Sequence, residues 1–197
     1  MSHYFTDNQN LPHNRKDISF RFLNVDYRFV SDDGVFSKNH IDQGTEILLK
    51  VVSQQELQGS ILDLGCGIGV IAICVKTLFP KTEVMGIDVN SRALECAVKN
   101  AGQNRVQVRF EKRDGTRLDN TCMDWVVANP PVRVGKAILY QLFDQVYETL
   151  KPGGQFIFVM RKSHGALSAQ KKCVELFGNC AILEKSKGFY ILYSAKR

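Results

Sequence analysis

The sequence lacks any apolar run that approaches the ~20 residues needed to cross a lipid bilayer. We therefore expect no membrane-spanning helix and no membrane partner. The first residues, Met1 to Asp7, are polar and lack the apolar core of a secretory signal. Together these absences favour a cytoplasmic protein.

The six cysteines include no C-x-x-C pair, the spacing typical of zinc sites and redox motifs. Cys66, Cys74, Cys96 and Cys122 lie in segments that we expect to be buried or half-buried. A free cysteine in such a segment behaves as a small apolar side chain. We therefore expect reduced cysteines, with neither disulfides nor a metal site.

What the chain does have is an ordinary globular composition, with 197 residues, 44% of them hydrophobic and 23% charged. This length suits one domain, which we place at residues 18–197 after a flexible N-terminal arm, residues 1–17. The formal net charge is +6, from 26 basic and 20 acidic residues. This excess of positive charge is a mild indication of a polyanionic partner, and it fits equally a basic enzyme that binds no nucleic acid.

Strand and helix patterns alternate along most of the chain. Apolar periodicity predicts an N-terminal β-hairpin over residues 18–30, with its turn near Asn24, and then a helix over about 40–53. The alternation indicates an α/β fold with a mostly parallel, seven-stranded sheet that ends in an antiparallel hairpin. The predicted sheet strands cover 61–64, 83–88, 106–110, 123–128, 155–160, 180–184 and 189–194. The later helices cover about 69–78, a segment that begins at Ser91, 135–150 (stopped by Lys151–Gly154) and 165–177.

Gly65, Gly67 and Gly69 follow the first sheet strand and precede a helix, as in a nucleotide-binding turn. A dinucleotide motif, G-x-G-x-x-G, would need its third glycine at position 70, which is valine. The chain instead reads D-x-G-x-G-x-G, with Asp63 ahead of the turn and Asp88 at the end of the next strand.

A carboxylate at Asp63 suits a ligand with positive charge better than it suits a pyrophosphate, which prefers a bare helix N-terminus. S-adenosylmethionine, with its sulfonium and ammonium groups, is such a ligand. Two simpler interpretations are a glycine turn that only packs the helix on the sheet, and a helix-capping role for Asp63.

Four polar residues fall at the predicted carboxyl ends of successive strands, the edge where open α/β sheets bind ligands. They are Asp63, Asp88, Asp114 and Asn129. Each one alone fits an ordinary loop residue or cap, but their regular spacing favours a shared site.

Asn129 is followed by Pro130 and Pro131. Consecutive prolines remove two N–H donors, stiffen the backbone and push the preceding residue toward an extended conformation. Acceptor oxygens held in this way can stabilise the positive charge that grows on an exocyclic amine during methyl transfer. We therefore interpret Asn129–Pro131 as the catalytic segment; the simpler alternative is a turn that only ends the strand.

Taken together, Asp63–Gly69, Asp88 and Asn129–Pro131 resemble the class I S-adenosylmethionine-dependent methyltransferases that modify amino nitrogens. More narrowly, Gly34–Ser37, Asn129–Lys136 and Arg161–Gly165 are similar to segments of the guanine-N2 methyltransferases of small-subunit ribosomal RNA. The resemblance spans about residues 18–194. It implies a Rossmann-like methyltransferase fold, S-adenosyl-L-methionine as cofactor and structured RNA, either ribosomal RNA or the small ribosomal subunit, as partner.

The resemblance also implies roles for individual residues. Asn129 and the carbonyl of Pro130 would hold the target amino group, with Pro131 completing the segment. Asp88 would hold the ribose of the cofactor, and Asp114 its adenine amino group. The implied cofactor-binding set is Phe36, Ser37, Asp63, Gly65, Cys66, Gly67, Gly69, Asp88, Val89, Asp114, Gly115 and Asn129, in which Phe36 and Ser37 close the site.

One departure concerns the residue after the two prolines, which is commonly aromatic in amino methyltransferases and is Val132 here. Stacking on the target would then come from elsewhere, with Phe36 and Tyr4 as candidates, or the target is held differently. Basic residues near the predicted edge fit either contacts to RNA phosphates or a solvated surface. They are Arg133, Lys136, Arg161 and Lys162.

We therefore expect methyl transfer to an exocyclic amine of RNA, and the leading candidate for the acceptor is guanine N2 of small-subunit ribosomal RNA. A protein glutamine, adenine or a small molecule is the alternative acceptor, because Val132 breaks the usual pattern. A third hypothesis is a non-catalytic RNA-binding protein that retains the cofactor pocket, and the glycine spacing disfavours a nicotinamide oxidoreductase. The sequence fits a monomer or a homodimer.

Overall fold

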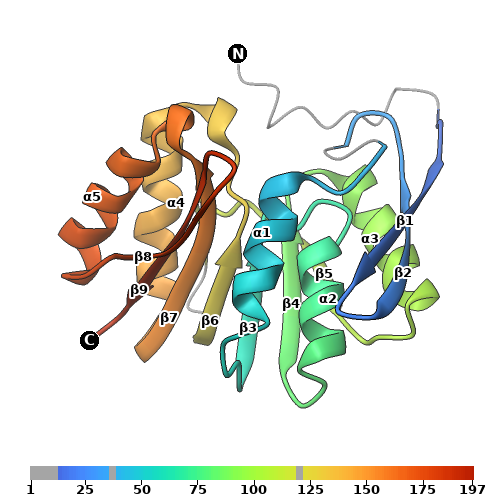
Figure 1. Cartoon of the computed structure of the whole chain (residues 1–197), viewed down its shortest axis with the longest axis horizontal. Coiled ribbons are helices and arrows are strands. Elements are labelled where there is room, and N and C mark those ends of the chain that lie inside the picture. The colour runs from blue at the N-terminus through green and yellow to red at the C-terminus, as the bar shows by residue number, and fades with distance from the viewer. Residues whose placement is uncertain (1–12, 36–38, 119–121) are drawn as a thin grey trace.

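The computed structural model describes residues 13–35, 39–118 and 122–197. It contains a two-stranded hairpin and a seven-stranded sheet with helices on both faces (Figure 1). The hairpin strands are β1, Lys16–Phe22, and β2, Val25–Ser31. The sheet strands are β3 Ser60–Leu64, β4 Glu83–Asp88, β5 Arg109–Lys112, β6 Met123–Ala128, β7 Leu150–Arg161, β8 Ala181–Ser186 and β9 Phe189–Ala195. The helices are α1 Gln43–Val52, α2 Val70–Leu78, α3 Ser91–Gln103, α4 Lys136–Thr149 and α5 Ala166–Phe177, with short 3-10 helices η1 Val132–Val134 and η2 Lys162–His164.

The large sheet has the strand order β5-β4-β3-β6-β7-β9-β8. Neighbours from β5 to β7 run parallel, and β9 is antiparallel to both β7 and β8. The predicted α/β fold is therefore confirmed, with its mostly parallel seven-stranded sheet and both antiparallel hairpins. The predicted turn of the N-terminal hairpin is also confirmed, at Leu23 and Asn24, which take φ values of 45° and 63°.

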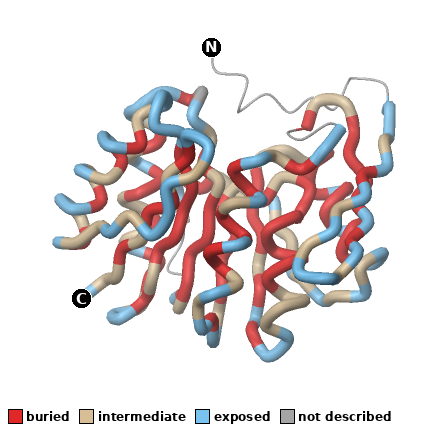
Figure 2. Tube along the Cα trace, viewed as in Figure 1, coloured by how far each residue is buried: buried red, intermediate tan, exposed pale blue. Residues whose placement is uncertain are grey.

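Two hydrophobic cores lie on opposite faces of this sheet, whose central strands are buried along most of their length (Figure 2). Trp125 and Val127 of β6 belong to one core, and Val126 and Ala128 to the other. Because successive strand residues point to opposite faces, one continuous apolar run fills both cores. Helices α1, α2 and α3 cover the first core, and α4 and α5 the second. In the described part of the chain no helix is both long and apolar enough to cross a membrane.

Two asparagines attach the N-terminal hairpin to α3. The buried Asn100 accepts the Val30 N–H at 2.6 Å and donates to the Val30 carbonyl at 3.0 Å. It also donates to the carbonyl of Ile68, in the glycine loop, at 2.9 Å. Asn104 makes the same pair of bonds with Arg28, at 3.1 and 2.7 Å, in a more exposed position. The hairpin is thus bonded to the same helix that supports the glycine loop.

Two predicted boundaries near helix ends were wrong. The helix expected from about residue 40 begins at Gln43, because Asp42 adopts an extended conformation and caps it by accepting the Thr45 N–H at 3.2 Å. The strand expected over 106–110 lies at Arg109–Lys112 instead. Its start is delayed because Arg105 takes a positive φ of 57° and the Val106 N–H still donates back to the Ala101 carbonyl, at the end of α3.

Two further expectations were wrong in part. Lys151–Gly154 ends α4 but belongs to the long strand β7, whose pairing with β6 jumps from Leu150 opposite Met123 to Gln155 opposite Trp125. The intervening proline and glycines bulge out of the ladder, since proline has no N–H to donate. Cys122, expected to be buried or half-buried, is exposed, whereas Cys66, Cys74 and Cys96 are buried.

Replacing Asn100 with alanine should lower the free energy of unfolding by about 2–3 kcal/mol, because three buried backbone groups lose their partner. The matched control Asn104→Ala removes the same pair of bonds near solvent and should cost about 1 kcal/mol or less, since water can replace the amide. Urea denaturation followed by circular dichroism measures both. Equal losses in the two variants would contradict the role of burial.

Candidate functional site

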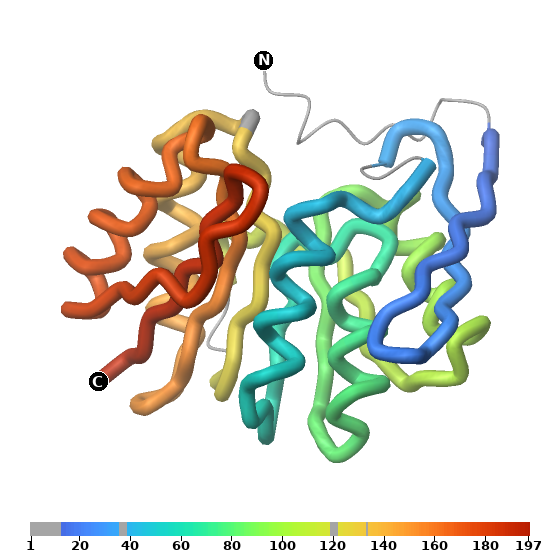
Figure 3. Tube along the Cα trace, in the orientation of Figure 1, coloured from blue at the N-terminus to red at the C-terminus, as the bar shows by residue number. Residues whose placement is uncertain are grey.

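The carboxyl ends of β5, β4, β3 and β6 form one edge of the sheet, at the top of Figures 1 and 3. Asp114 follows β5 by two residues, and Asp88 ends β4. Asp63 is the penultimate residue of β3, and Asn129 follows β6 directly. The parallel order of the strands therefore brings these four predicted residues to the same edge.

The glycine loop between β3 and α2 uses several of its N–H groups internally. Those of Gly65 and Cys66 both donate to the Ile87 carbonyl at 2.9 Å. The Gly67 N–H donates to Asp88 Oδ2 at 2.8 Å. Because a dinucleotide turn binds its pyrophosphate through free N–H groups, this loop is poorly suited to that ligand.

The glycines of the loop serve different purposes, although all three take positive φ values of 52° to 85°. A Cβ on Gly69 would lie 2.9 Å from Phe110 Cζ and 3.1 Å from the Cβ of Ala97, so this glycine lets α2 pack closely. A Cβ on Gly67 would meet no atom of the described residues within 4 Å. Gly67 therefore borders open space, where a ligand can approach the backbone.

Two buried carboxyl groups flank the loop. Asp63 is 1% exposed, and its Oδ2 accepts the Ala72 N–H in the first turn of α2 at 2.9 Å. Its Oδ1 is buried without a hydrogen-bond partner in the described part of the chain. Burial, with a smaller contribution from the charge of Asp88, raises the pKa of Asp63 to about 7. Asp63 thus caps α2, one of the interpretations considered from the sequence, and still keeps one oxygen for a ligand.

Burial also raises the pKa of Asp88, against the lowering effect of its bonds to the N–H groups of Asn90 and Gly67. Buried carboxylates of this kind favour a ligand with positive charge, because such a ligand offsets the cost of their ionisation. Burial raises the pKa of the Cys66 thiol well above its ordinary value. The Cys66 side chain is therefore a neutral thiol and is poorly suited to act as a nucleophile.

At the edge strand, Asp114 Oδ1 accepts from the N–H and the hydroxyl of Thr116, at 2.9 and 2.8 Å. A Cβ on Gly115 would lie 2.7 Å from Leu64 and 2.8 Å from Leu142, so the glycine there is explained by packing.

Gly34, two residues ahead of Phe36, lies close to the end of β4. The half-buried Asn90, two residues after Asp88, donates from Nδ2 to the Gly34 carbonyl at 2.9 Å. Val89, between them, is half-buried. Phe36, Ser37, Tyr4 and the side chain of Arg133 lie outside the described residues.

Asn129 is half-buried, and its amide is held from α1. Nδ2 donates to Asp42 Oδ2 at 3.1 Å and to Thr45 Oγ1 at 2.9 Å. The next residue, Pro130, is buried. Sequence reasoning missed both partners. A capping pattern points to Asp42 as the residue before a helix, but no sequence signal connects it with Asn129.

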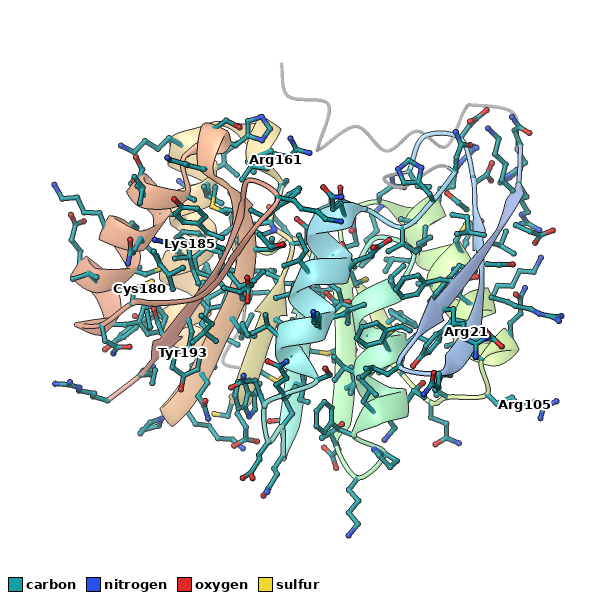
Figure 4. All side chains as sticks on the ribbon, in the orientation of Figure 1. Arg21, Arg105, Arg161, Cys180, Lys185 and Tyr193 are labelled. Carbon is teal, nitrogen blue, oxygen red and sulfur yellow. The ribbon has the colours of Figure 1, made fainter. Side chains whose placement is uncertain are left out.

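Cationic side chains also lie at this edge. Arg161 ends β7, next to β6, and its guanidinium carbon lies 4.5 Å from the ring centroid of Phe189. Figure 4 shows Arg161 at the upper edge, beside the start of α1. Lys162 begins η2 and Lys136 begins α4, and both side chains are exposed.

The family model of the methyltransferase small domain matches residues 26–193. The chain belongs to this family. YbxB of Bacillus subtilis, named as an uncharacterized protein, is 36% identical over 98% of this chain and 98% of its own. Ribosomal RNA small subunit methyltransferase C of Hahella chejuensis is 36% identical over 66% of this chain and 39% of its own length. The solved 16S rRNA N2 methyltransferase RsmC of T. thermophilus, in complex with AdoMet and guanosine, has a TM-score of 0.84 and 25% identity over 95% of this chain and 52% of its own.

The chain thus spans about half, or less, of the length of each of these two proteins, whose names refer to ribosomal RNA. The predicted enzyme class and cofactor are confirmed: the chain is a methyltransferase that uses S-adenosylmethionine. The site fits this cofactor, because Gly67 opens onto free space and the unpartnered oxygen of Asp63 is available to a cationic group. The disfavoured alternative, a nicotinamide oxidoreductase, is excluded by the family.

The raised pKa of Asp63 predicts how stability depends on pH. Between about pH 4 and pH 7 the Asp63 carboxyl group is ionised in the unfolded protein and protonated in the folded protein. The unfolded state is therefore increasingly favoured, and the free energy of unfolding falls, as the pH rises through this range. Asp63→Asn removes this loss, because the amide oxygen can still accept the Ala72 N–H. In cofactor-free protein, the free energy of unfolding of the variant should therefore rise relative to that of wild type by up to about 4 kcal/mol as the pH increases through this range.

Urea denaturation of both proteins at about pH 4.5 and about pH 8 measures the difference. Asp124→Asn is the matched control: Lys151 and Ser60 lower the pKa of Asp124 to about 2, so this carboxyl group is ionised in both states at both pH values, and its replacement should shift stability by nearly the same amount at each. A stability difference between Asp63→Asn and wild type that does not change with pH would contradict the buried, protonated state.

Proposed function

We propose that this chain transfers a methyl group to an exocyclic amino nitrogen of RNA, with guanine N2 of small-subunit ribosomal RNA as the first candidate. Asn129 carries the proposal. It follows β6, the neighbour of β3 in the sheet, so its amide lies one strand away from Asp63 and the glycine loop. Pro130 and Pro131 add carbonyl acceptors and no N–H donors.

The cofactor residues are assigned on the same basis. Asp63 and Gly67 would hold the methionine part, Asp88 the ribose and Asp114 the adenine amino group. Gly69 and Gly115 face packed side chains, so we assign them to shaping the site rather than to contacts. The remaining members of the proposed set are Phe36, Ser37, Gly65, Cys66 and Val89.

When bound, S-adenosylmethionine supplies a methyl group whose bond to sulfur breaks as the bond to nitrogen forms, leaving a neutral thioether while the nitrogen loses one proton. An exocyclic amine is a weak nucleophile, because its lone pair is delocalised into the ring. The oxygens of Asn129 and Pro130 would accept its two hydrogens and stabilise the positive charge that develops on the nitrogen. This role needs correct placement rather than a strong general base.

Two observations support RNA as the acceptor. The two methyltransferases described above are named for ribosomal RNA, and one of them is solved with guanosine. The edge that carries Asn129 also presents Arg161, Lys162 and Lys136, whose cationic groups are exposed and can contact phosphates.

Asn129→Ala should lower methyl transfer by about 10²–10³-fold, the usual cost of removing one preorganised polar group from a transition state. Binding of S-adenosylmethionine should change little, because the cofactor-binding set is otherwise intact. Tritiated-methyl transfer into undermethylated ribosomal RNA and small subunits, with digestion to nucleosides, measures the first. Calorimetry measures the second.

Wild-type protein should place the label in N2-methylguanosine. Label in methyladenosine, in protein glutamine or in a small molecule would overturn the proposed acceptor and leave the enzyme class standing. Unchanged turnover by Asn129→Ala would remove the proposed role of the asparagine.

Arg161→Ala and Lys162→Ala should each weaken RNA binding and reduce the slope of log affinity against log salt by about one. Lys50→Ala is the matched control, because this exposed lysine lies in the last turn of α1, at the opposite end of the helix. Fluorescence anisotropy between about 50 and 200 mM salt measures all three. An equal effect from Lys50→Ala would indicate general attraction to the net charge instead of contacts at this edge.

A further inference from the structure

We infer that Asp42 and Thr45 are positioning residues that hold the Asn129 amide with its oxygen toward the methyl acceptor, and that they thereby restrict the acceptor to a group that donates N–H. We call Asp42, Thr45 and Asn129 the Asn129 cluster. The identity of the acceptor rests on the proposed function, whereas the orientation of the amide does not.

The chemistry of the cluster fixes which end of the amide faces α1. A carboxylate can only accept hydrogen bonds, so the Asn129 atom at 3.1 Å from Asp42 Oδ2 must be the nitrogen. The same nitrogen lies 2.9 Å from Thr45 Oγ1. Its two hydrogens are therefore both used, and the end of the side chain that bonds to no described residue is Oδ1, with two lone pairs.

Packing keeps the cluster in place. Thr45 is buried, and Asp42 Oδ2 also accepts the Thr45 N–H at 3.2 Å as the cap of α1. A Cβ on Gly44 would lie 2.8 Å from Phe189 Cε1 and 2.9 Å from Asp42 Oδ2. The first turn of α1 is thus packed against β9, at the turn of the β8–β9 hairpin (Figure 3). This close packing leaves no room for a side chain at Gly44 and supports the helix start that holds the amide.

This orientation has a consequence for specificity. An oxygen that can only accept matches the hydrogens of an exocyclic amine, and it repels a keto oxygen or an unprotonated ring nitrogen. If the amide turned over, its NH2 group would face the hydrogens of the amine and transfer would slow. Loss of the cluster should therefore lower kcat more than it weakens binding of the RNA.

A swap of the two side chains tests the inference. Asn129→Asp alone places two carboxylates at the distance of the present hydrogen bond, where they repel each other. Asp42→Asn alone is mild, because asparagine caps a helix as well as aspartate and its oxygen can still accept from Asn129. In the double variant, the new amide at position 42 can donate to the new carboxylate at position 129 when its nitrogen takes the place of Oδ2. This exchanges the cap bond from the Thr45 N–H for a restored pair, and it leaves an acceptor oxygen toward the amine.

The double variant should therefore be at least about tenfold more active than Asn129→Asp, a coupling typical of residues in one hydrogen-bond network. The assay is initial-rate methyl transfer to undermethylated ribosomal RNA. Additive losses would overturn the inference, since a merely structural role of Asp42 predicts that a second change never restores activity.

Thr45 provides a second comparison. Thr45→Val should lower kcat with unchanged affinity for S-adenosylmethionine, and Thr45→Ser should restore it, because serine keeps the hydroxyl. Thr149→Val is the matched control, since Thr149 is equally buried and its hydroxyl has no partner in the described chain. A loss of kcat in Thr45→Ser equal to that in Thr45→Val would count against the hydroxyl.

A measurement on the protein alone separates this inference from the proposed function. The side-chain NH2 protons of Asn129, assigned by their disappearance in Asn129→Asp, should exchange with solvent at least about tenfold more slowly than those of the exposed Asn24, and Thr45→Val should speed them. Exchange as fast as in Asn24 would overturn the inference. If RNA accepts no methyl group, the proposed function fails while this exchange still decides the orientation of the amide.

Discussion

The hydrogen bond from the Gly67 N–H to the carboxylate of Asp88 is the interaction on which the arrangement of the site depends. It spans 2.8 Å and ties the glycine loop to the end of the next strand. Together with the bonds of Gly65 and Cys66 to the Ile87 carbonyl, it occupies N–H groups that a dinucleotide turn would offer to phosphates. The edge that remains is acidic and suits a sulfonium donor. The choice between two classes of nucleotide-like ligand is thus made by the partners of a few backbone donors.

This arrangement costs stability. A carboxyl group that is 1% exposed and has one oxygen without a partner in the described chain is an unfavourable component of a folded core. Asp63 nevertheless caps α2, so its cost is partly offset by the helix that it helps to begin. Proteins retain such groups where a ligand completes them, and the cationic cofactor of this family is of the right charge.

Segments ahead of the Rossmann-like core complete the site from the other side. The N-terminal hairpin is bonded through Asn100 to Ile68 of the glycine loop, and α1 is bonded through Asp42 and Thr45 to Asn129. Both contacts use side-chain amides that satisfy buried groups far away in the sequence. The early part of the chain therefore stabilises the two loops that the chemistry needs.

The fold and the common edge of the candidate site could be predicted from the sequence, because strand patterning, glycine spacing and Asn129-Pro-Pro131 are local features with local physical causes. The edge shared by Asp63, Asp88, Asp114 and Asn129 followed from the rule that parallel strands present their carboxyl ends together. The tertiary structure alone decided which partners these side chains have. Asp42 and Asn129 are 87 residues apart, and a hydrogen bond across that separation is set by how α1 packs on the sheet, which no periodicity records. The same holds for the pKa of Asp63, since burial is a property of the assembled core and not of the residues on either side of it.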